Sequence, residues 1–176
     1  MEYTVLGRPD AGPTLRLDHR EFSYAGKFVM SNTGKAVARA DGSIVAAVAF
    51  NRDRTDETTV WLRYITVRGD RRGEGIGARL AAFLVDRSPV AADRFRIAVN
   101  NSFAYEAMYK AGFGYTGERT GIAEVILEHP AERSADRYRT GLAVFADREE
   151  LTPAERQFID RKRERGPPER VDPPDG

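Results

Sequence analysis

Apolar and polar residues form short alternating blocks through the first part of the chain. The runs at 35–40 (KAVARA) and 43–50 (SIVAAVAF) flank Asp41 and Gly42, a dipeptide that favours a two-residue hairpin because both residues tolerate positive φ. A third run at 59–67 (TVWLRYITV) is rich in β-branched and aromatic residues. The pattern therefore predicts three consecutive antiparallel strands.

Helical periodicity begins only after these strands. The remaining predicted elements are a helix from Ile76 to about Ser88, a strand over 94–99, a helix over 101–111 that ends at Gly112, a short strand at Tyr115 and Thr116, and a final strand over 121–128. Because helices follow a run of strands, we expect a mixed α/β fold with a mostly antiparallel sheet flanked by helices.

The character of the chain changes after Pro130. Tyr138, Leu142 and Phe145 form a helical stripe, and TPAE at 152–155 is a capping box that begins a helix ending near Arg165. We therefore predict a domain over 1–130, a C-terminal helical extension over 131–165 and a disordered, proline-rich tail over 166–176. The apolar stripe needs cover, so we expect the extension to dock on the domain or on a second copy, as in a homodimer.

Composition argues against several kinds of partner. Twenty-eight Lys and Arg balance twenty-seven Asp and Glu, which gives no reason to expect a nucleic acid or a membrane surface. The basic run RKRER in the last helix is expected to be a solvated face. There are no cysteines, and His19 and His129 suggest no metal cluster, so we expect no metal. The N-terminus has no basic start followed by an apolar stretch, and we expect a cytoplasmic protein.

The most informative stretch is DRRGEGIGARL at 70–80. A Walker A loop needs Lys followed by Ser or Thr, which are missing here. A dinucleotide fingerprint should directly follow its strand, whereas RGDRR intervenes before Gly73. The reading that fits best is a pyrophosphate cradle, in which amides at the start of a helix and neighbouring arginines hold phosphate oxygens. The alternative is a glycine-rich connector with incidental arginines.

These residues carry a family resemblance. Arg72, Gly75 and Gly77 fill the R/Q-x-x-G-x-G/A motif of the GNAT superfamily of acyl-CoA N-acyltransferases, and NNSFAYEAMYKAGFGYTGE resembles a later family pattern through Asn101 and Gly112. The resemblance covers roughly residues 35 to 130. It implies that acetyl-CoA is the cosubstrate. The residues that it implies for acetyl-CoA binding are Ile65, Thr66, Val67, Arg71, Arg72, Gly73, Glu74, Gly75, Ile76, Gly77, Ala78 and Asn101.

The acid and the base depart from the family pattern. The usual tyrosine acid stands four residues before the glycine of G-F, where this chain has Met108, so Tyr109 and, one turn earlier, Tyr105 are the candidates. Both could instead be core tyrosines. The usual glutamate positions of the base hold Arg63 and Arg96, neither of which can accept a proton. Glu57, Glu21 and His19 are loop candidates, and an acceptor amine of low pKa would need no dedicated base.

The resemblance implies transfer of an acetyl group from acetyl-CoA to a primary amine by direct attack in a ternary complex. The acceptor could be a small molecule or a protein. The alternatives are a sensor that binds acyl-CoA without turnover, suggested by the two arginines, and a nucleic-acid-binding protein that uses the basic run.

Overall fold

A computed structural model describes residues 1–121 and 123–176 of the chain. They form two compact units. The first unit comprises Met1–Phe95 together with Val171–Gly176, and the second comprises Arg96–Arg170. The division falls within a strand, β5 (Arg94–Val99).

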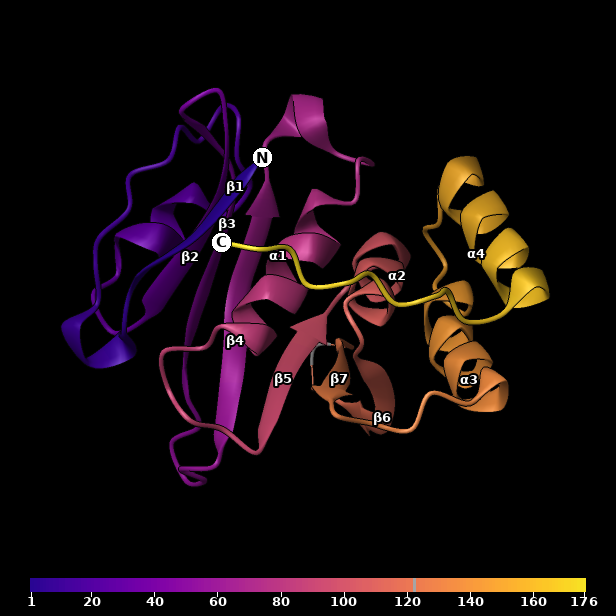
Figure 1. Ribbon diagram of the computed structural model, residues 1–176. Coiled ribbons are helices and arrows are strands. Elements are labelled where there is room, and N and C mark those ends of the chain that lie inside the picture. The colour runs from indigo at the N-terminus through magenta and orange to yellow at the C-terminus, as the bar shows by residue number, and fades with distance from the viewer. Residues whose placement is uncertain (122) are drawn as a thin grey trace. The chain divides into compact units, whose positions relative to one another are not determined.

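The first unit contains four antiparallel strands in the order β1-β2-β3-β4 (Figure 1). These strands are β1 (Glu2–Gly7), β2 (Gly34–Ala40), β3 (Ser43–Arg52) and β4 (Thr59–Val67). The predicted hairpin is confirmed, since Asp41 and Gly42 have φ of 50° and 79° between β2 and β3. β1 was not predicted. It pairs with β2, 28 to 37 positions further along the chain, and no local pattern indicates such a partner.

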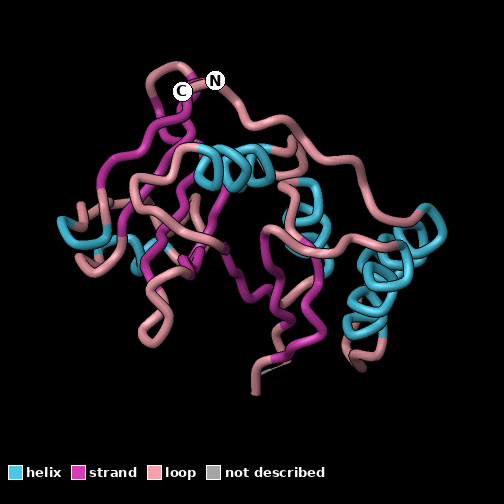
Figure 2. Tube along the Cα trace, turned by 60° about the horizontal axis from the view of Figure 1, so that its bottom comes forward, coloured by secondary structure: helices cyan, strands magenta, loops and turns pink. Residues whose placement is uncertain are grey.

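The two faces of this sheet are covered by different parts of the chain. Helix α1 (Ile76–Asp86) packs on one face through its buried apolar side, as the helical spacing of the sequence predicts (Figures 1 and 2). A second apolar cluster contains Phe28 from a short 3₁₀ helix (Ala25–Val29), with Val37, Ala47 and Ala49 from β2 and β3. The chain termini lie near each other in this unit (Figure 2).

The second unit combines the end of β5 with two further strands and three helices. Its elements are α2 (Ser102–Lys110), β6 (Gly114–Arg119), β7 (Val125–His129), α3 (Ala135–Ala146) and α4 (Pro153–Arg165). β7 lies between β5 and β6, and its pairing with β6 is antiparallel. Position 122, which the predicted strand over 121–128 included, lies outside the described residues.

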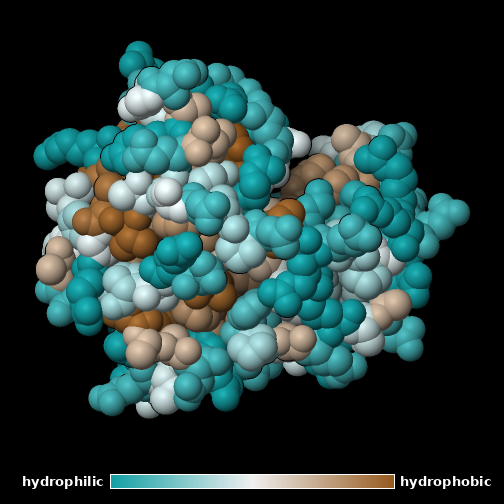
Figure 3. All heavy atoms as spheres, in the orientation of Figure 1, coloured by the Kyte–Doolittle hydropathy of each residue, from teal (hydrophilic) through white to brown (hydrophobic). Residues whose placement is uncertain are grey.

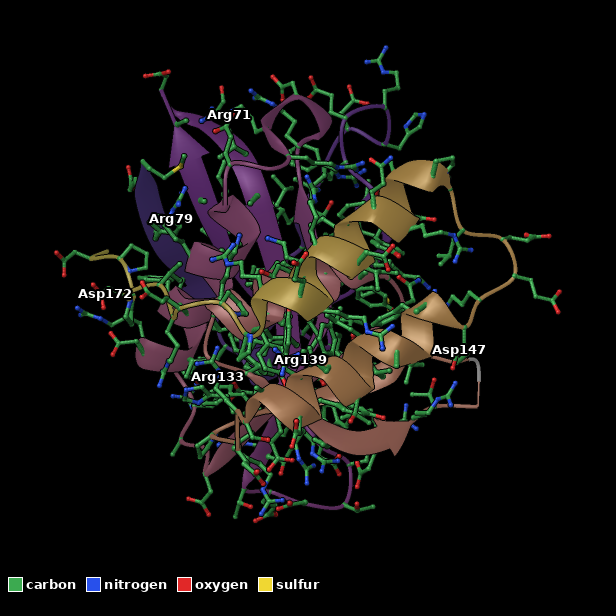
Figure 4. The ribbon with its side chains drawn as sticks, turned by 90° about the vertical axis from the view of Figure 1, so that its right-hand side faces the viewer. Arg71, Arg79, Arg133, Arg139, Asp147 and Asp172 are labelled. Atoms are coloured by element: carbon green, nitrogen blue, oxygen red, sulfur yellow. The ribbon has the colours of Figure 1, made fainter. Side chains whose placement is uncertain are left out.

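The C-terminal helices pack within this second unit. α3 contacts α2 and β6, and α4 contacts α2 and α3, with Arg139 Nε donating to the Arg163 carbonyl at 2.8 Å (Figure 4). Tyr138, Leu142 and Phe145 are buried, as their stripe predicts. The predicted capping box at 152–155 is confirmed.

The fold class is confirmed as mixed α/β, with antiparallel strand pairs and flanking helices. The domain limits over 1–130 and 131–165 and the disorder of 166–176 stay predictions. Within the second unit, the first part of the tail makes contacts: Pro168 is buried and its carbonyl accepts from Arg133 Nη2 at 3.3 Å.

Candidate active site

The glycine-rich turn connects β4 to α1. Gly73 and Gly75 have φ of 82° and 75°, a backbone conformation that costs glycine little and other residues more. Two main-chain hydrogen bonds hold the residues just before the turn. Arg68 N donates to the Val45 carbonyl of β3 at 2.8 Å, and Gly69 N donates to the Glu21 carbonyl at 2.9 Å. The direction in which the chain enters α1 is therefore well defined.

The start of α1 has the features of an anion site. Gly75 is the N-cap and supplies no side-chain acceptor, so the first-turn amides lack a side-chain cap, and the helix dipole adds positive potential. A Cβ on Gly77 would lie 3.3 Å from Cγ2 of Val67. Gly77 thus lets the helix approach the end of β4 closely.

The arginines around the turn have different partners (Figure 4). Arg71 Nε donates to the Glu74 carboxylate at 2.9 Å, and this bond lowers the pKa of Glu74. Arg72 Nη2 donates to Ser23 Oγ at 2.9 Å. Arg79 donates to the Glu74 carbonyl at 2.9 Å and to Tyr3 Oη at 3.2 Å. Arg71 is therefore partly neutralised by its neighbour, whereas the bonds of Arg72 and Arg79 are to uncharged groups.

β4 carries an irregularity next to the residues expected to face pantetheine. Ala49 pairs with Tyr64 and Phe50 pairs with Leu62, so β4 has one extra residue, Arg63. Beyond it, Ile65 and Val67 are half-buried and Thr66 is buried. Among the described residues, the Thr66 hydroxyl has no hydrogen-bond partner.

Asn101 and the two tyrosines belong to α2. Asn101 is the N-cap of α2, and its Oδ1 accepts from Ala104 N at 2.8 Å. Without a bound ligand, its side chain therefore has a structural role. Tyr105 and Tyr109 are fully buried. The Tyr105 hydroxyl donates to the Tyr138 carbonyl at 2.9 Å, and burial raises its pKa well above the usual range. The Tyr109 hydroxyl accepts from Tyr115 N at 2.9 Å.

The usual positions of the base hold arginines with separate partners. Arg63 Nε donates to Asn51 Oδ1 at 2.6 Å. Arg96 Nε donates to the Glu128 carboxylate at 2.9 Å, and its Nη1 donates to that of Glu118 at 3.1 Å. The loop candidates His19, Glu21 and Glu57 are exposed. Of these, Glu21 lies beside the glycine turn, because its carbonyl holds Gly69.

Sequence reasoning missed several residues that support this region. Ser23 and Tyr3 hold Arg72 and Arg79, and Asn51 holds Arg63. Their sequence separations from the residues that they hold range from 12 to 76 positions, so no local spacing could have indicated them.

The mixed α/β fold and the glycine-rich start of α1 define the class of protein. The model of the acetyltransferase (GNAT) family matches residues 6–115, and the chain belongs to that family. No curated protein sequence matches the chain significantly.

One solved structure shows the same fold. It is yncA from Salmonella typhimurium, described as a putative acetyltransferase with its cofactor acetyl-CoA, at 16% identity and TM-score 0.50, with 58% of this chain and 68% of that chain covered. A Bacillus subtilis acetyltransferase in complex with CoA has 17% identity and TM-score 0.48, with 55% and 75% covered. A GNAT acetyltransferase from Elizabethkingia anophelis with acetyl-CoA bound has 17% identity and TM-score 0.46, with 55% and 74% covered.

Within residues 1–121 and 123–176, no group of three or more His, Cys, Asp or Glu side chains could hold a metal ion. No helix in the described part of the chain is long and apolar enough to cross a membrane.

Proposed function

We propose that this chain transfers the acetyl group of acetyl-CoA to a primary amine. The observation that carries the proposal is the uncapped start of α1, which follows β4 through a turn with two glycines at positive φ, within the region that matches the acetyltransferase family. The solved structure of the same fold that holds acetyl-CoA, yncA from Salmonella typhimurium, supports the choice of cosubstrate.

In this proposal, the segment Arg71–Ala78 holds the pyrophosphate. Main-chain amides at the helix start supply the donors, and Arg72 adds a charge-assisted bond by exchanging its Ser23 partner for a phosphate oxygen. Glu74 contributes its main chain, since its carboxylate is paired with Arg71. The pantetheine arm bonds to main-chain groups of Ile65, Thr66 and Val67, and to Asn101.

The reaction is a direct acyl transfer. The amine nitrogen attacks the thioester carbonyl, a C–N bond forms, the C–S bond breaks, the nitrogen loses a proton, and the leaving thiolate takes one. A main-chain N–H of β4 stabilises the oxygen that becomes negative. Neither Arg63 nor Arg96 can take the amine proton. We assign that proton to water, with Glu21, Glu57 or His19 as the ultimate acceptor.

The hydroxyls of the two candidate acids have different hydrogen-bond partners, and this difference supports one assignment over the other. The Tyr105 proton is already donated to the Tyr138 carbonyl, and a Cβ on Gly141 would lie 2.1 Å from its oxygen, so Tyr105 is packed into the interface of α2 and α3. The Tyr109 hydroxyl accepts a bond from Tyr115 N and also interacts with the Tyr105 hydroxyl, and among the described residues no carbonyl accepts its proton. Tyr109 is therefore the proposed acid and Tyr105 the alternative.

A thiol-release assay tests the proposal. The protein is incubated with acetyl-CoA and a panel of primary amines and one amine-bearing peptide, and free CoA thiol is followed over time. Amine-dependent thiol release supports transfer. Tight CoA binding by calorimetry without release on any amine would instead support the alternative, a sensor that binds acyl-CoA without turnover, which the arginines at the usual base positions suggest.

The remaining expectations are proposed with the activity. They are a cytoplasmic location, no nucleic-acid partner, an acetyltransferase domain over 1–130 with an appendage over 131–165, and a homodimer as one way to cover apolar surface. Exposed apolar side chains support the last of these (Figure 3). Among residues 1–121 and 123–176, the large ones are Met1, Tyr24, Val29, Met30 and Phe103.

A further inference from the structure

A cavity in the first unit is separate from the glycine turn. It has a volume of about 410 Å³ and lies between the last residues of β3, the first half of β4 and the loop that precedes β2. Its lining includes Trp61, Arg63 and Tyr64 from β4, and Asn51 from β3. None of the residues that we assign to CoA lines it.

The charge of this cavity favours an anion. Its lining carries three arginines, Arg52, Arg54 and Arg63, against one acid, Asp53. The Asp53 carboxylate is already satisfied, because it accepts from Trp61 Nε1 at 2.7 Å and from Thr55 N at 2.9 Å. These bonds lower the pKa of Asp53 to about 2, and the bond from the Thr55 amide contributes more than the bond from the Trp61 indole. Arg52 Nη1 is held by the Glu57 and Ala91 carbonyls.

Arg63 is the arginine whose guanidinium is oriented and still has donors to offer. Its Nε donates to Asn51 Oδ1, and its Cζ lies 5.3 Å from the centre of the Trp61 ring. That bond uses Nε, and within the described parts of the chain the two Nη groups have no hydrogen-bond partner, so they can bind a ligand. A planar guanidinium fixed in this way suits two-pronged binding of a carboxylate or a phosphate.

The rest of the lining suits an apolar body. Trp61 and Tyr64 present aromatic rings, and Met30 is an exposed apolar side chain at the same cavity. Thr33 also lines the cavity, and among the described residues its buried hydroxyl has no partner. Aromatic walls with a few oriented polar groups are typical of small-molecule sites.

The geometry points to an acceptor site: we propose that this cavity selects an amine that carries a carboxylate or phosphate and an aromatic or apolar body, with Arg63 as the residue that binds the anionic group. The proposal rests on the proposed function, because it assigns the ligand as the acceptor. It differs from a surface ion pair in that Asn51 and Trp61 orient the cation before the ligand arrives.

Trp61 makes the test direct, because it is the single tryptophan of the chain. Phenylalanine, phenylalaninamide, phenethylamine and phosphoethanolamine are titrated against the full chain while Trp61 fluorescence is excited selectively. We expect phenylalanine to quench the fluorescence saturably. Its Kd should be at least about tenfold lower than that of phenylalaninamide or phenethylamine, because one charge-assisted bond contributes about that much affinity. Phosphoethanolamine, which carries a phosphate but no aromatic body, tests whether the anionic group alone is enough for binding.

Variants then assign the effect to Arg63. Arg63→Gln should weaken phenylalanine binding about 10-fold to 100-fold. Arg63→Lys should weaken this binding less, because lysine keeps the positive charge and loses only the paired donors of the guanidinium. Arg8→Gln is the matched control, because Arg8 is an arginine of the same unit outside the cavity. All variants should keep the wild-type CoA affinity in calorimetry.

The outcomes are distinct. Equal binding of anionic and neutral amines, no binding of any of the four, or unchanged binding in Arg63→Gln would overturn the site. Binding by phenylalanine without its acetylation, while another amine is acetylated, would overturn its assignment to the acceptor. If the wild-type chain neither binds CoA nor releases thiol with any amine, the proposed function is wrong, and the acceptor assignment is wrong with it.

Discussion

Two glycines shape the backbone at the start of α1, where we propose that CoA binds. Gly75→Ala places a Cβ on a residue with φ of 75°, which costs about 1 kcal/mol of folding free energy, and Gly77→Ala crowds Val67. We expect both variants to fold and to bind CoA at least about tenfold more weakly, a loss of about 1.4 kcal/mol. Calorimetric titration with CoA, alongside thermal unfolding without ligand, measures both effects.

Two variants calibrate this prediction. Gly26→Ala is the matched control, because an added Cβ there meets no atom within 4 Å. Arg72→Ala should weaken CoA binding more mildly than the glycine variants, because the main-chain donors remain. Undiminished CoA affinity in both Gly75→Ala and Gly77→Ala would make the turn a mere connector.

Substitutions of the two buried tyrosines should lower the free energy of unfolding by similar amounts but should differ in their effect on kcat. Tyr109→Phe leaves the Tyr115 amide without its acceptor, and Tyr105→Phe leaves the Tyr138 carbonyl without its donor, so each should lower the free energy of unfolding by about 1–3 kcal/mol. If Tyr109 is the acid, only Tyr109→Phe should also lower kcat, by about 100-fold or more, with CoA affinity retained. Steady-state kinetics with the best amine and chemical denaturation separate the two effects. Equal kcat in both variants contradicts the assignment.

At the scale of elements, the interface of α2 and α3 depends on one small residue. Gly141 in α3 faces the Tyr105 ring, and an added Cβ would lie 2.1 Å from the Tyr105 oxygen and 2.7 Å from its Cζ. Gly141→Ala must therefore push the two helices apart or force Tyr105 from its rotamer, and should cost about 1–3 kcal/mol. Denaturant unfolding measures this loss.

A double variant makes the cause of that loss testable. Tyr105→Leu shortens the side chain and removes the clash, so Gly141→Ala should cost clearly less in the Tyr105→Leu background than in the wild type. Purely additive costs would mean that the two residues do not interact, contrary to the packing described for α2 and α3.

At the scale of the molecule, the C-terminal helices act as cover for the second unit. Tyr138, Leu142 and Phe145 of α3 and Ile159 of α4 are buried there. A chain that ends at residue 130 should expose the apolar surface under them and show lower solubility and a lower Tm. A chain that ends at residue 165 is the control. It loses the bond from Arg133 to the Pro168 carbonyl but keeps α3 and α4, so it should lower both properties much less.

Thermal unfolding, together with light scattering on a sizing column, measures these truncations. The same runs report the oligomeric state, which tests the homodimer. A chain ending at residue 130 that is as stable and as soluble as the full chain would show that α3 and α4 do not act as cover.

The sequence by itself determines the features that depend on neighbours in the chain. Asp41 and Gly42 define a hairpin because of their own φ preferences, Thr152 and Glu155 cap α4 across three residues, and the glycines of 73–77 mark the turn and the family. Each signal lies within a few residues, so it can be read without knowing the rest of the molecule.

Only the tertiary structure decides which distant residues meet. Tyr105 and Tyr109 are indistinguishable by helical spacing, and their hydroxyls differ because Tyr138 and Tyr115 approach them from other elements. In the sequence, Arg63 is only an unexpected arginine at a position where the family usually has a glutamate base. It becomes an oriented cation because strand pairing places Asn51 beside it, and a hydrogen bond across 12 residues follows from that pairing rather than from local preference.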